Sequence, residues 1–374
     1  MGSKRWMLRN GLGSLLRREA PRARRFIDLF TGSGAVACFV AEQMPMPVRA
    51  FDLQFFCIAL ADSVIGRTEV LDPVGIWENW LRKAVNFLNS AAIREPNCKI
   101  PARKVFTASY VAEVRSRCAN EKPDFVITRA YGGHYFSRTQ ALWIDALRAT
   151  LPANAPERTV ALSALICASS QCVAAPGHTA QPFQPTRSAK PFLYSAWSAD
   201  VVKATKEALE GLAIRHALRR GQTSLLDANE AAEKIRATDL VFIDPPYSGV
   251  HYSRFYHVLE TLACGGCAAV SGVGRYPPTL ERPTSLYSMK SHSREAITDL
   301  LHEVAERGAT AIITFPDKRC SNGISSDLVK RIGSECFRRS EEMIVRGRFS
   351  TLGGNGNQRD ARQPSSELVL VLRS

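Results

Sequence analysis

The sequence has no long hydrophobic run. No apolar stretch among its 374 residues is long enough to span a bilayer, which excludes a protein built on transmembrane helices. The N-terminus also lacks the hydrophobic region of a secretory signal peptide, so we expect a cytoplasmic protein without a membrane partner. The apolar content of 45% is typical of a globular chain, which could hold one large core or one core with an inserted module.

Acidic residues are scarce relative to basic ones. The chain has 35 Asp and Glu against 49 Lys and Arg, which gives a formal charge of +14. Such a surplus attracts polyanions, so it suits nucleic acid better than a small neutral substrate. Eight of the first 25 residues are Lys or Arg, a run that fits a solvated surface and phosphate contact equally well.

Regular cysteine pairing is missing too. The ten cysteines are scattered in a chain without an export signal, so we expect reduced thiols that are mostly buried. Cys264 and Cys267 have Cys-x-x-Cys spacing, but no second pair is spaced to complete the four ligands of a zinc site. We therefore expect no metal.

The most informative motif is Asp244-Pro245-Pro246-Tyr247, which follows the apolar run 240–243. A buried strand would thus present an acid and an aromatic ring at its carboxyl end. The two prolines hold the backbone extended and cannot continue a ladder, so the Asp244 and Pro245 carbonyls can point into a cleft. These groups suit a planar heterocycle with an exocyclic amine, whose hydrogens need acceptors. The alternative is a tight loop that merely ends a strand.

A second motif lies near the start of the chain. Residues 26–30 read as a short buried strand, followed by Thr31-Gly32-Ser33-Gly34 and an apolar helix to Val40. Such glycines let the backbone approach a ligand, and a helix N-terminus favours negative charge. The third glycine of the dinucleotide fingerprint is absent, which argues against a nicotinamide enzyme. Asp52 closes a second strand where an acid reaches ribose hydroxyls, so a nucleoside-containing ligand is predicted.

The segment 30–34, with Asp244-Pro245-Pro246-Tyr247 far downstream, resembles the S-adenosylmethionine-dependent DNA amino-methyltransferases, specifically the Dam-type (D12 class) adenine-N6 enzymes. In that family the glycine motif comes first, a target-recognition segment is inserted, and the Asp-Pro-Pro-Tyr strand follows. The order agrees over most of the chain, while the long middle matches only loosely. The resemblance implies an α/β fold, a Rossmann-like class I methyltransferase sheet with helices on both faces and an inserted target-recognition module.

The resemblance also implies domains and roles. Residues 1–66 and 196–374 would form the catalytic domain, and 67–195 the inserted DNA-binding region. The catalytic residues would be Asp244, Pro245, Pro246 and Tyr247. Segment 4–11 occupies the place of the family's cofactor-contacting segment, although it departs from the usual aromatic, glycines and lysine. The cofactor S-adenosyl-L-methionine is expected at Trp6, Asn10, Asp28, Phe30, Thr31, Gly32, Ser33, Gly34, Asp52, Leu53, Asp227 and Asp244.

The region 124–191 is rich in turns, and we expect it to lie outside the regular sheet. In the Dam-like arrangement it carries the target-recognition module, with side chains suited to phosphates and base edges. DNA is therefore expected at Arg129, His134, Tyr135, Arg138, His178, Gln181, Gln184, Arg187 and Lys190. Beyond Tyr247, we expect His251, Tyr252 and Arg254 to line the pocket for an extruded base. An ordinary polar surface is the alternative.

The spacing of apolar residues predicts further helices and strands. Helices are predicted over 55–64, over 74–92 and through 201–212, with Trp77 and Trp80 in the core. Strand-like segments are predicted at 224–227, 309–315 and 367–372, and a mobile loop at 350–357.

Three other functions remain open: cytosine-N4 methylation of DNA, methylation of an RNA or protein-glutamine amine, and a non-catalytic DNA-binding regulator. For the adenine-N6 enzyme implied by the resemblance, the expected partner is double-stranded DNA, and the protein is expected to be nucleoid-associated. No obligatory protein partner is evident, and a monomer could methylate both strands of a palindrome in two visits.

Overall fold

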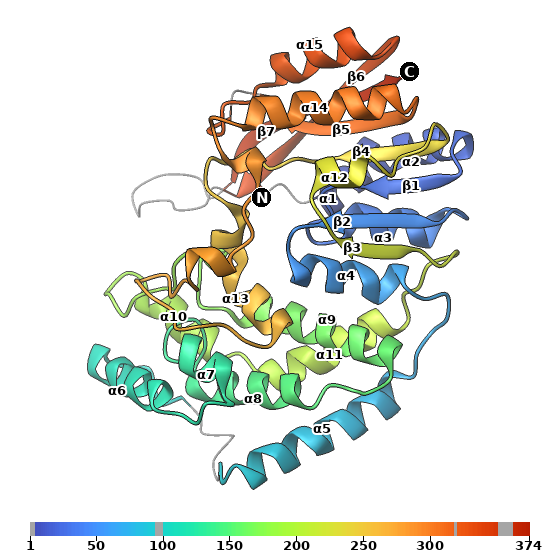
Figure 1. Ribbon diagram of the computed structural model, residues 1–374. Coiled ribbons are helices and arrows are strands. Elements are labelled where there is room, and N and C mark those ends of the chain that lie inside the picture. Colours follow the sequence, from blue (N-terminus) through green and yellow to red (C-terminus); the bar gives the residue numbers. More distant parts are fainter. Residues whose placement is uncertain (1–3, 94–99, 318–319, 351–361) are drawn as a thin grey trace. The chain divides into compact units, whose positions relative to one another are not determined.

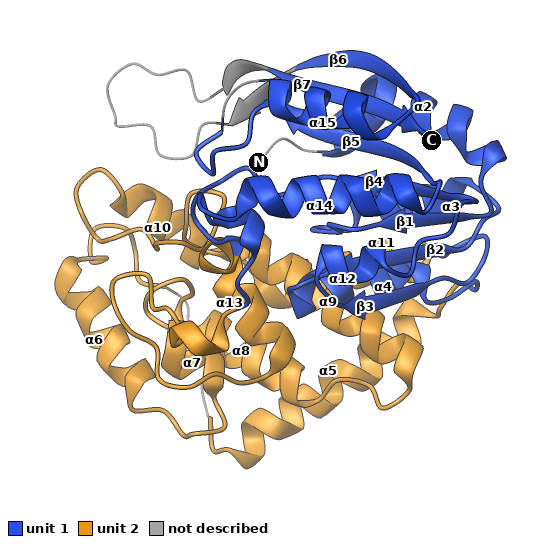
Figure 2. Cartoon of the chain, turned by 45° about the horizontal axis from the view of Figure 1, so that its top comes forward, with its two compact units in different colours: residues 1–69, 216–252, 283–374 blue, residues 70–215, 253–282 orange. Residues whose placement is uncertain are grey.

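The structure is a computed structural model that describes residues 4–93, 100–317, 320–350 and 362–374. The chain divides into two compact units, coloured separately in Figure 2. Unit 1 comprises residues 1–69, 216–252 and 283–374, and unit 2 comprises 70–215 and 253–282. The ranges differ from the expected domains because 196–215 and 253–282 cluster with unit 2. A role of unit 2 in target recognition remains a prediction.

Unit 1 contains a seven-stranded sheet in the order β3-β2-β1-β4-β5-β7-β6 (Figure 1). The first five strands in this order are parallel, while β7 runs antiparallel to both β5 and β6. This mixed α/β sheet confirms the expected Rossmann-like methyltransferase fold. Its strands are β1 (Arg25–Asp28), β2 (Val48–Asp52), β3 (Gln222–Leu225), β4 (Asp239–Ile243), β5 (Thr310–Pro316), β6 (Arg339–Ser350) and β7 (Arg362–Arg373).

Side chains of the buried strands point alternately to the two faces of the sheet, and each face carries a hydrophobic core. Ile27 and Val241 belong to one core with helices α12, α14 and α15, whereas Phe26 and Phe242 belong to the other with α2, α3 and α4. Neighbouring side chains of a strand point to opposite faces, so continuous apolar runs require helices on both sides. These helices are α2 (Gly13–Glu19), α3 (Ala35–Gln43), α4 (Phe55–Ile65), α12 (Ala228–Ala232), α14 (Ser293–Glu306) and α15 (Ser326–Cys336).

The N-terminal segment is helical but kinked. Helix α1 (Lys4–Met7) leads into the π-helix η1 (Leu8–Leu12) and then into α2, with non-helical backbone at Asn10 and at Gly11, whose φ is 112°. The short 3-10 helix η2 (Ala20–Arg22) connects α2 to β1, and a second one, η4 (Leu286–Ser288), precedes α14.

Part of the basic run near the N-terminus has a structural role. Arg18 and Arg22 form ion pairs with the buried Glu19, and Arg25 Nε and Nη2 donate to the two carboxylate oxygens of the buried Asp239 at 2.8 and 2.5 Å. These three arginines are therefore paired with acids within unit 1.

The described residues of unit 2 are organised by helices, and local capping explains several helix starts. Asp72 caps α5 by accepting from two backbone N–H groups, and Ser137 forms a capping box with Gln140 at α8. Trp80 is buried as expected, and its indole donates to the Leu147 carbonyl at 2.9 Å. The helices are α5 (Pro73–Ser90), α6 (Ala108–Ala119), α7 (Val126–Tyr131), α8 (Arg138–Ala149), α9 (Ala155–Cys172), α10 (Lys190–Trp197), α11 (Val201–Ala213) and η3 (Thr279–Glu281), while α13 (Tyr252–Cys264) starts at the unit boundary.

The region 124–191 lies outside the sheet as predicted, but its reading as mainly turns was wrong. Helices α7, α8 and α9 occupy most of it. Helix α9 is buried continuously from Val160 to Ile166 and therefore shows no amphipathic rhythm in the sequence. The loop expected at 350–357 lies outside the described residues except for Ser350, the last residue of β6. No helix within the described ranges is both long and apolar enough to cross a membrane.

Candidate functional site

Four acids stand at the carboxyl ends of adjacent strands in unit 1. Asp28 and Asp52 end β1 and β2, while Asp227 and Asp244 follow β3 and β4 closely. Because these strands are parallel neighbours, their carboxyl ends meet at one edge of the sheet, where open α/β folds bind ligands. The sequence-based expectation that these acids converge therefore agrees with the topology.

Asp28 is the most buried of these acids, with 1% of its surface exposed. Burial raises its pKa to about 8, and the nearby carboxylates of Asp244 and Asp52 contribute to the rise. The backbone N–H of Phe30 donates to its Oδ1 at 3.3 Å. A cation bound beside Asp28 would favour the ionised form of this carboxyl.

Asp244 is held by a lysine from the N-terminal helix. Lys4 Nζ lies 2.9 Å from Asp244 Oδ1, and the Thr314 hydroxyl donates to the same oxygen at 2.8 Å. Within the described residues no donor contacts Oδ2, which leaves that oxygen to accept from a substrate. The Asp244 side chain is 25% exposed, so a ligand can reach it.

Lys4 also binds Glu367 of β7, at 2.7 Å. Burial lowers the pKa of Lys4, but the carboxylates of Asp244 and Glu367 outweigh this effect and raise the pKa above its ordinary value. Lys4 is therefore a charged group that compensates two acids. Sequence reasoning missed this role, although Lys4 lies in the segment assigned to cofactor contact.

The rest of the Asp-Pro-Pro-Tyr motif is fixed by Asn322. This fully buried amide donates to the Pro246 carbonyl at 2.8 Å and to the Tyr287 carbonyl at 2.9 Å. Tyr247 is half-buried beside it, and burial raises the pKa of its phenol to about 12, with Asp244 adding to the rise. Asn322 was not foreseen, since an Asn in a loop gives no sequence signal for such a distant partner.

The glycine turn and Asp52 form one hydrogen-bonded unit. Gly32 and Gly34 have φ of 52° and 73°, conformations that favour glycine, and Gly34 leads directly into α3. The backbone N–H of Gly32 donates to Asp52 Oδ2 at 2.8 Å, and that of Gln54 donates to Oδ1 at 2.9 Å. The sequence had placed these groups near each other, and the structure brings them into direct contact.

Some of the other expected cofactor residues follow the carboxyl ends of the strands, and the rest lie in the N-terminal segment. Thr31, Ser33 and Leu53 belong to the loops beside the glycine turn, and the Phe30 ring meets Tyr287 edge-on with centroids 4.9 Å apart. Asp227 is half-buried and caps α12 by accepting from Asn229 N–H. In contrast, Trp6 is 41% exposed, and the Asn10 amide donates to the Trp6 carbonyl within the N-terminal turn.

The residues expected at DNA differ widely in exposure. Four are exposed in their units: Arg129, Gln181, Arg187 and Arg254. Seven are half-buried: His134, Arg138, His178, Gln184, Lys190, His251 and Tyr252. Arg138 already forms an ion pair with Glu121 at 2.6 Å. Burial lowers the pKa of His134 to about 3, and Arg115 and Arg275 lower it further, so His134 is neutral.

Tyr135 requires correction. It is fully buried in unit 2, and its hydroxyl donates to the carbonyls of Thr179 and Gly274 at 2.5 and 2.9 Å. Its hydrogen-bonding capacity and its ring are therefore used inside the unit. Tyr135 is a core residue, and its expected contact with DNA was wrong.

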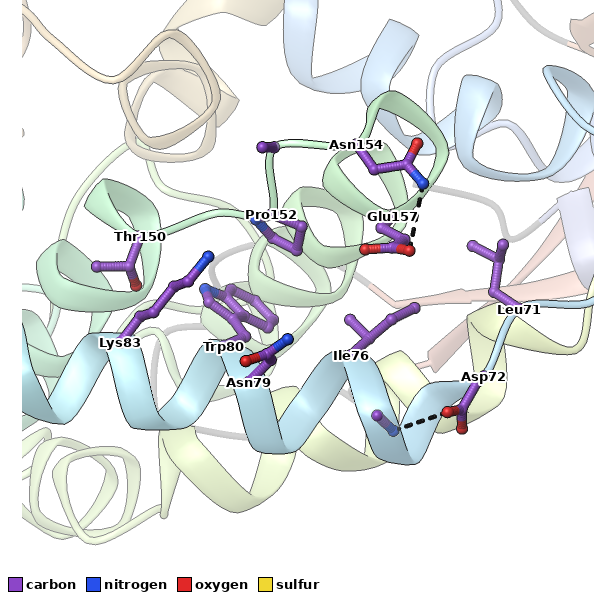
Figure 3. A pocket seen from close by; sticks show the side chains of 12 residues that line it. Leu71, Asp72, Ile76, Asn79, Trp80, Lys83, Thr150, Pro152, Asn154 and Glu157 are labelled. Carbon is purple, nitrogen blue, oxygen red and sulfur yellow. Dashed lines mark hydrogen bonds between the residues drawn. The ribbon is translucent and has the colours of Figure 1, made fainter.

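Two cavities are lined by residues other than these acids. One of about 430 Å³ in unit 2 runs along α5 (Figure 3) and is lined by Leu71, Asp72, Gly75, Ile76, Asn79, Trp80, Lys83, Thr150, Pro152, Ala153, Asn154 and Glu157. The other, of about 710 Å³, lies at the amino ends of β1, β2 and β3 and includes Arg25, Arg49 and Gln222. Neither is lined by a residue of the predicted catalytic, cofactor-binding or DNA-binding sets.

Comparison with known proteins gives a short match. The chain is 36% identical over 77 residues to the type II methyltransferase M.FokI of Planomicrobium okeanokoites. The matched part covers 21% of this chain and 12% of that protein. The chain matches no family model. The match agrees in class with the Rossmann-like methyltransferase sheet described above.

Proposed function

We propose that this protein is a DNA methyltransferase that transfers a methyl group from S-adenosyl-L-methionine to the N6 amine of an adenine flipped out of double-stranded DNA. The observation that carries the proposal is the juxtaposition of a glycine turn and the Asp244 motif at one edge of a methyltransferase-like sheet. The partial match to a type II methyltransferase supports the same class.

The edge suits the proposed cofactor chemically. Asp52 is oriented by the glycine turn and by the Gln54 backbone, and its carboxylate would accept from ribose hydroxyls of the cofactor. Asp28 offers a buried carboxyl to a cationic group. Gly34 lets the glycine turn pack closely against α4, because a Cβ there would meet Ala61 Cα at 3.3 Å. When bound, S-adenosyl-L-methionine supplies a methyl group activated by its positive sulfur.

Asp244 would prepare the acceptor amine. The N6 lone pair of adenine is conjugated into the ring, so the amine is a poor nucleophile. Hydrogen bonds from the amine to Asp244 Oδ2 and to the Pro245 carbonyl would localise the lone pair on nitrogen. Lys4 and Thr314 hold the other oxygen of Asp244 and thereby fix its direction.

Tyr247 would stack on the extruded base. Its ring is half-buried, and Asn322 fixes the loop in which it lies by binding the preceding carbonyl. Because a base in duplex DNA hides its amine, extrusion is required and costs a few kcal/mol. The formal charge of +14 supports a polyanionic substrate.

A labelled-methyl assay tests the proposal. The protein is incubated with S-adenosyl-L-methionine carrying a tritiated methyl group and with unmethylated duplex DNA, and the digested nucleosides are identified by mass analysis. We expect N6-methyladenine. Label in cytosine would indicate an N4 enzyme, and label in RNA alone would indicate an RNA enzyme. The absence of transfer to any nucleic acid would refute the proposal.

A further inference from the structure

Two arginines of unit 2 lie against one tyrosine ring. The Arg254 guanidinium carbon is 4.8 Å from the centroid of the Tyr276 ring, and that of Arg282 is 5.5 Å from it. Arg254 comes from the first turn of α13, whereas Arg282 follows η3 directly. Two separate elements thus bring two positive charges to the same aromatic side chain, although like charges repel.

Tyr276 is held in place by bonds of its own. Its hydroxyl donates to the Ala180 carbonyl at 2.5 Å, and its backbone exchanges two hydrogen bonds with Ser271. The ring also contacts His257, with ring centroids 4.8 Å apart. The platform under the arginines is therefore fixed before any ligand arrives, which reduces the entropy that binding would cost.

The two guanidinium groups are not neutralised within the described residues. No carboxylate there forms an ion pair with Arg254 or Arg282, and the buried Nε of Arg282 has no hydrogen-bond partner. The Arg282 Nη2 donates to the neutral Thr279 hydroxyl at 3.0 Å. By contrast, Arg117 in the same unit pairs with Glu113. Two uncompensated guanidinium groups on one ring favour a bound anion.

We propose that Arg254 and Arg282, stacked on Tyr276, form a binding site for the phosphodiester backbone of DNA. This inference rests on the proposed function, since DNA is the substrate it names. Stacking covers the face of a guanidinium but leaves its N–H edge available, and that edge matches two oxygens of a phosphate. Such contacts position the duplex without reading its sequence.

The test is the salt dependence of DNA binding. Fluorescence anisotropy with an unmethylated duplex of mixed sequence is measured from about 50 to 200 mM salt for the whole protein and for Arg254→Gln and Arg282→Gln. Each phosphate contact adds about 0.9 to the slope of log affinity against log salt. We expect the slope of each variant to be smaller by about that amount. Over this fourfold salt range, the affinity of the wild type should therefore fall about 3.5-fold more than the affinity of either variant.

Two controls separate a phosphate site from simple charge or structural effects. Arg117→Gln removes the same charge from a paired arginine and is expected to leave the slope unchanged. Arg282→Lys is expected to restore the slope, because an ammonium still binds phosphate, whereas a purely structural guanidinium would not be replaced. Circular dichroism and melting temperature establish that each variant is folded.

The results distinguish this inference from the proposed function. Wild-type slopes in both glutamine variants, or an equal loss in Arg117→Gln, would overturn the phosphate site. So would a loss restricted to one DNA sequence at unchanged slope, since that indicates base reading. If the wild-type protein neither binds DNA nor transfers methyl groups, the proposed function itself fails.

Discussion

Replacing Lys4 by methionine removes the charge that compensates two acids at the candidate site. Lys4 lies 2.9 Å from Asp244 and 2.7 Å from Glu367, and its side chain is only 15% exposed. Methionine keeps the approximate length and apolar stem. The substitution therefore tests the charge while disturbing the packing little.

The expected loss of stability follows from burial. Removing one partner of a buried pair costs about 3–5 kcal/mol, because the other charge is left uncompensated. The Glu367 side chain is 6% exposed, but that of Asp244 is 25% exposed and can be partly solvated. We therefore expect a decrease of about 3 kcal/mol in the free energy of unfolding, at the lower end of that range.

The loss should depend on pH. Burial raises the pKa of Glu367 and Lys4 lowers it, so the Lys4→Met variant raises the pKa further. An acid whose folded pKa is raised contributes stability below its unfolded pKa of 4.5 and loses it as the pH rises. The gap between wild type and variant should thus widen above pH 4.5.

Urea denaturation from pH 5 to pH 8 measures both effects. Lys330→Met is the matched control, since Lys330 pairs with Glu342 on the surface and such pairs contribute about 0–1 kcal/mol. The rate of methyl transfer at saturating cofactor should also fall in Lys4→Met, because Asp244 is no longer held. If Lys4→Met is as stable and as active as Lys330→Met, the compensating role of Lys4 is wrong.

Three further outcomes are expected. Because the pKa of Asp28 is raised from 3.8 to about 8, the free energy of unfolding of the wild type should fall as the pH rises between these values, by at most about 1.4 kcal/mol per pH unit. The Asp28→Asn variant should show a smaller fall, measured by urea denaturation. Asn322→Ala should lower the rate of methyl transfer more than cofactor affinity. It should also cost about 1–3 kcal/mol of stability, because the Pro246 and Tyr287 carbonyls lose their donor. Gly34→Ala should cost about 1–2 kcal/mol of stability, since the φ of Gly34 is 73°. Gly211→Ala in α11 is the control: its Cβ would enter open space, and the substitution should stabilise the protein by about 0.5–1 kcal/mol. Thermal melting compares the two variants.

The sheet could be predicted well because its strands are short buried runs that end in turn-forming residues. Strands β1, β2, β4 and β5 all follow this pattern, and parallel pairing then brings Asp28, Asp52 and Asp244 to one edge. The prediction required no knowledge of packing, since topology alone fixes which strand ends are neighbours.

Contacts between distant segments could not be predicted. The pairing of Lys4 with Asp244 and the bond from Asn322 to Pro246 join parts of the chain with no local pattern in common. Tyr135 was misjudged because a tyrosine between a histidine and a phenylalanine reads as a binding surface, although it is buried. Helix α9 was missed because the continuous burial from Val160 to Ile166 removes the periodicity on which prediction depends.

The most direct test of the central claim is methyl transfer by the Asp244→Ala variant, measured beside its affinity for S-adenosyl-L-methionine. If Asp244 holds the adenine amine at the same edge as the glycine turn, transfer to DNA should be abolished while cofactor affinity is largely retained. Full transfer activity in the Asp244→Ala variant would contradict the assignment of Asp244 as the residue that activates the amine.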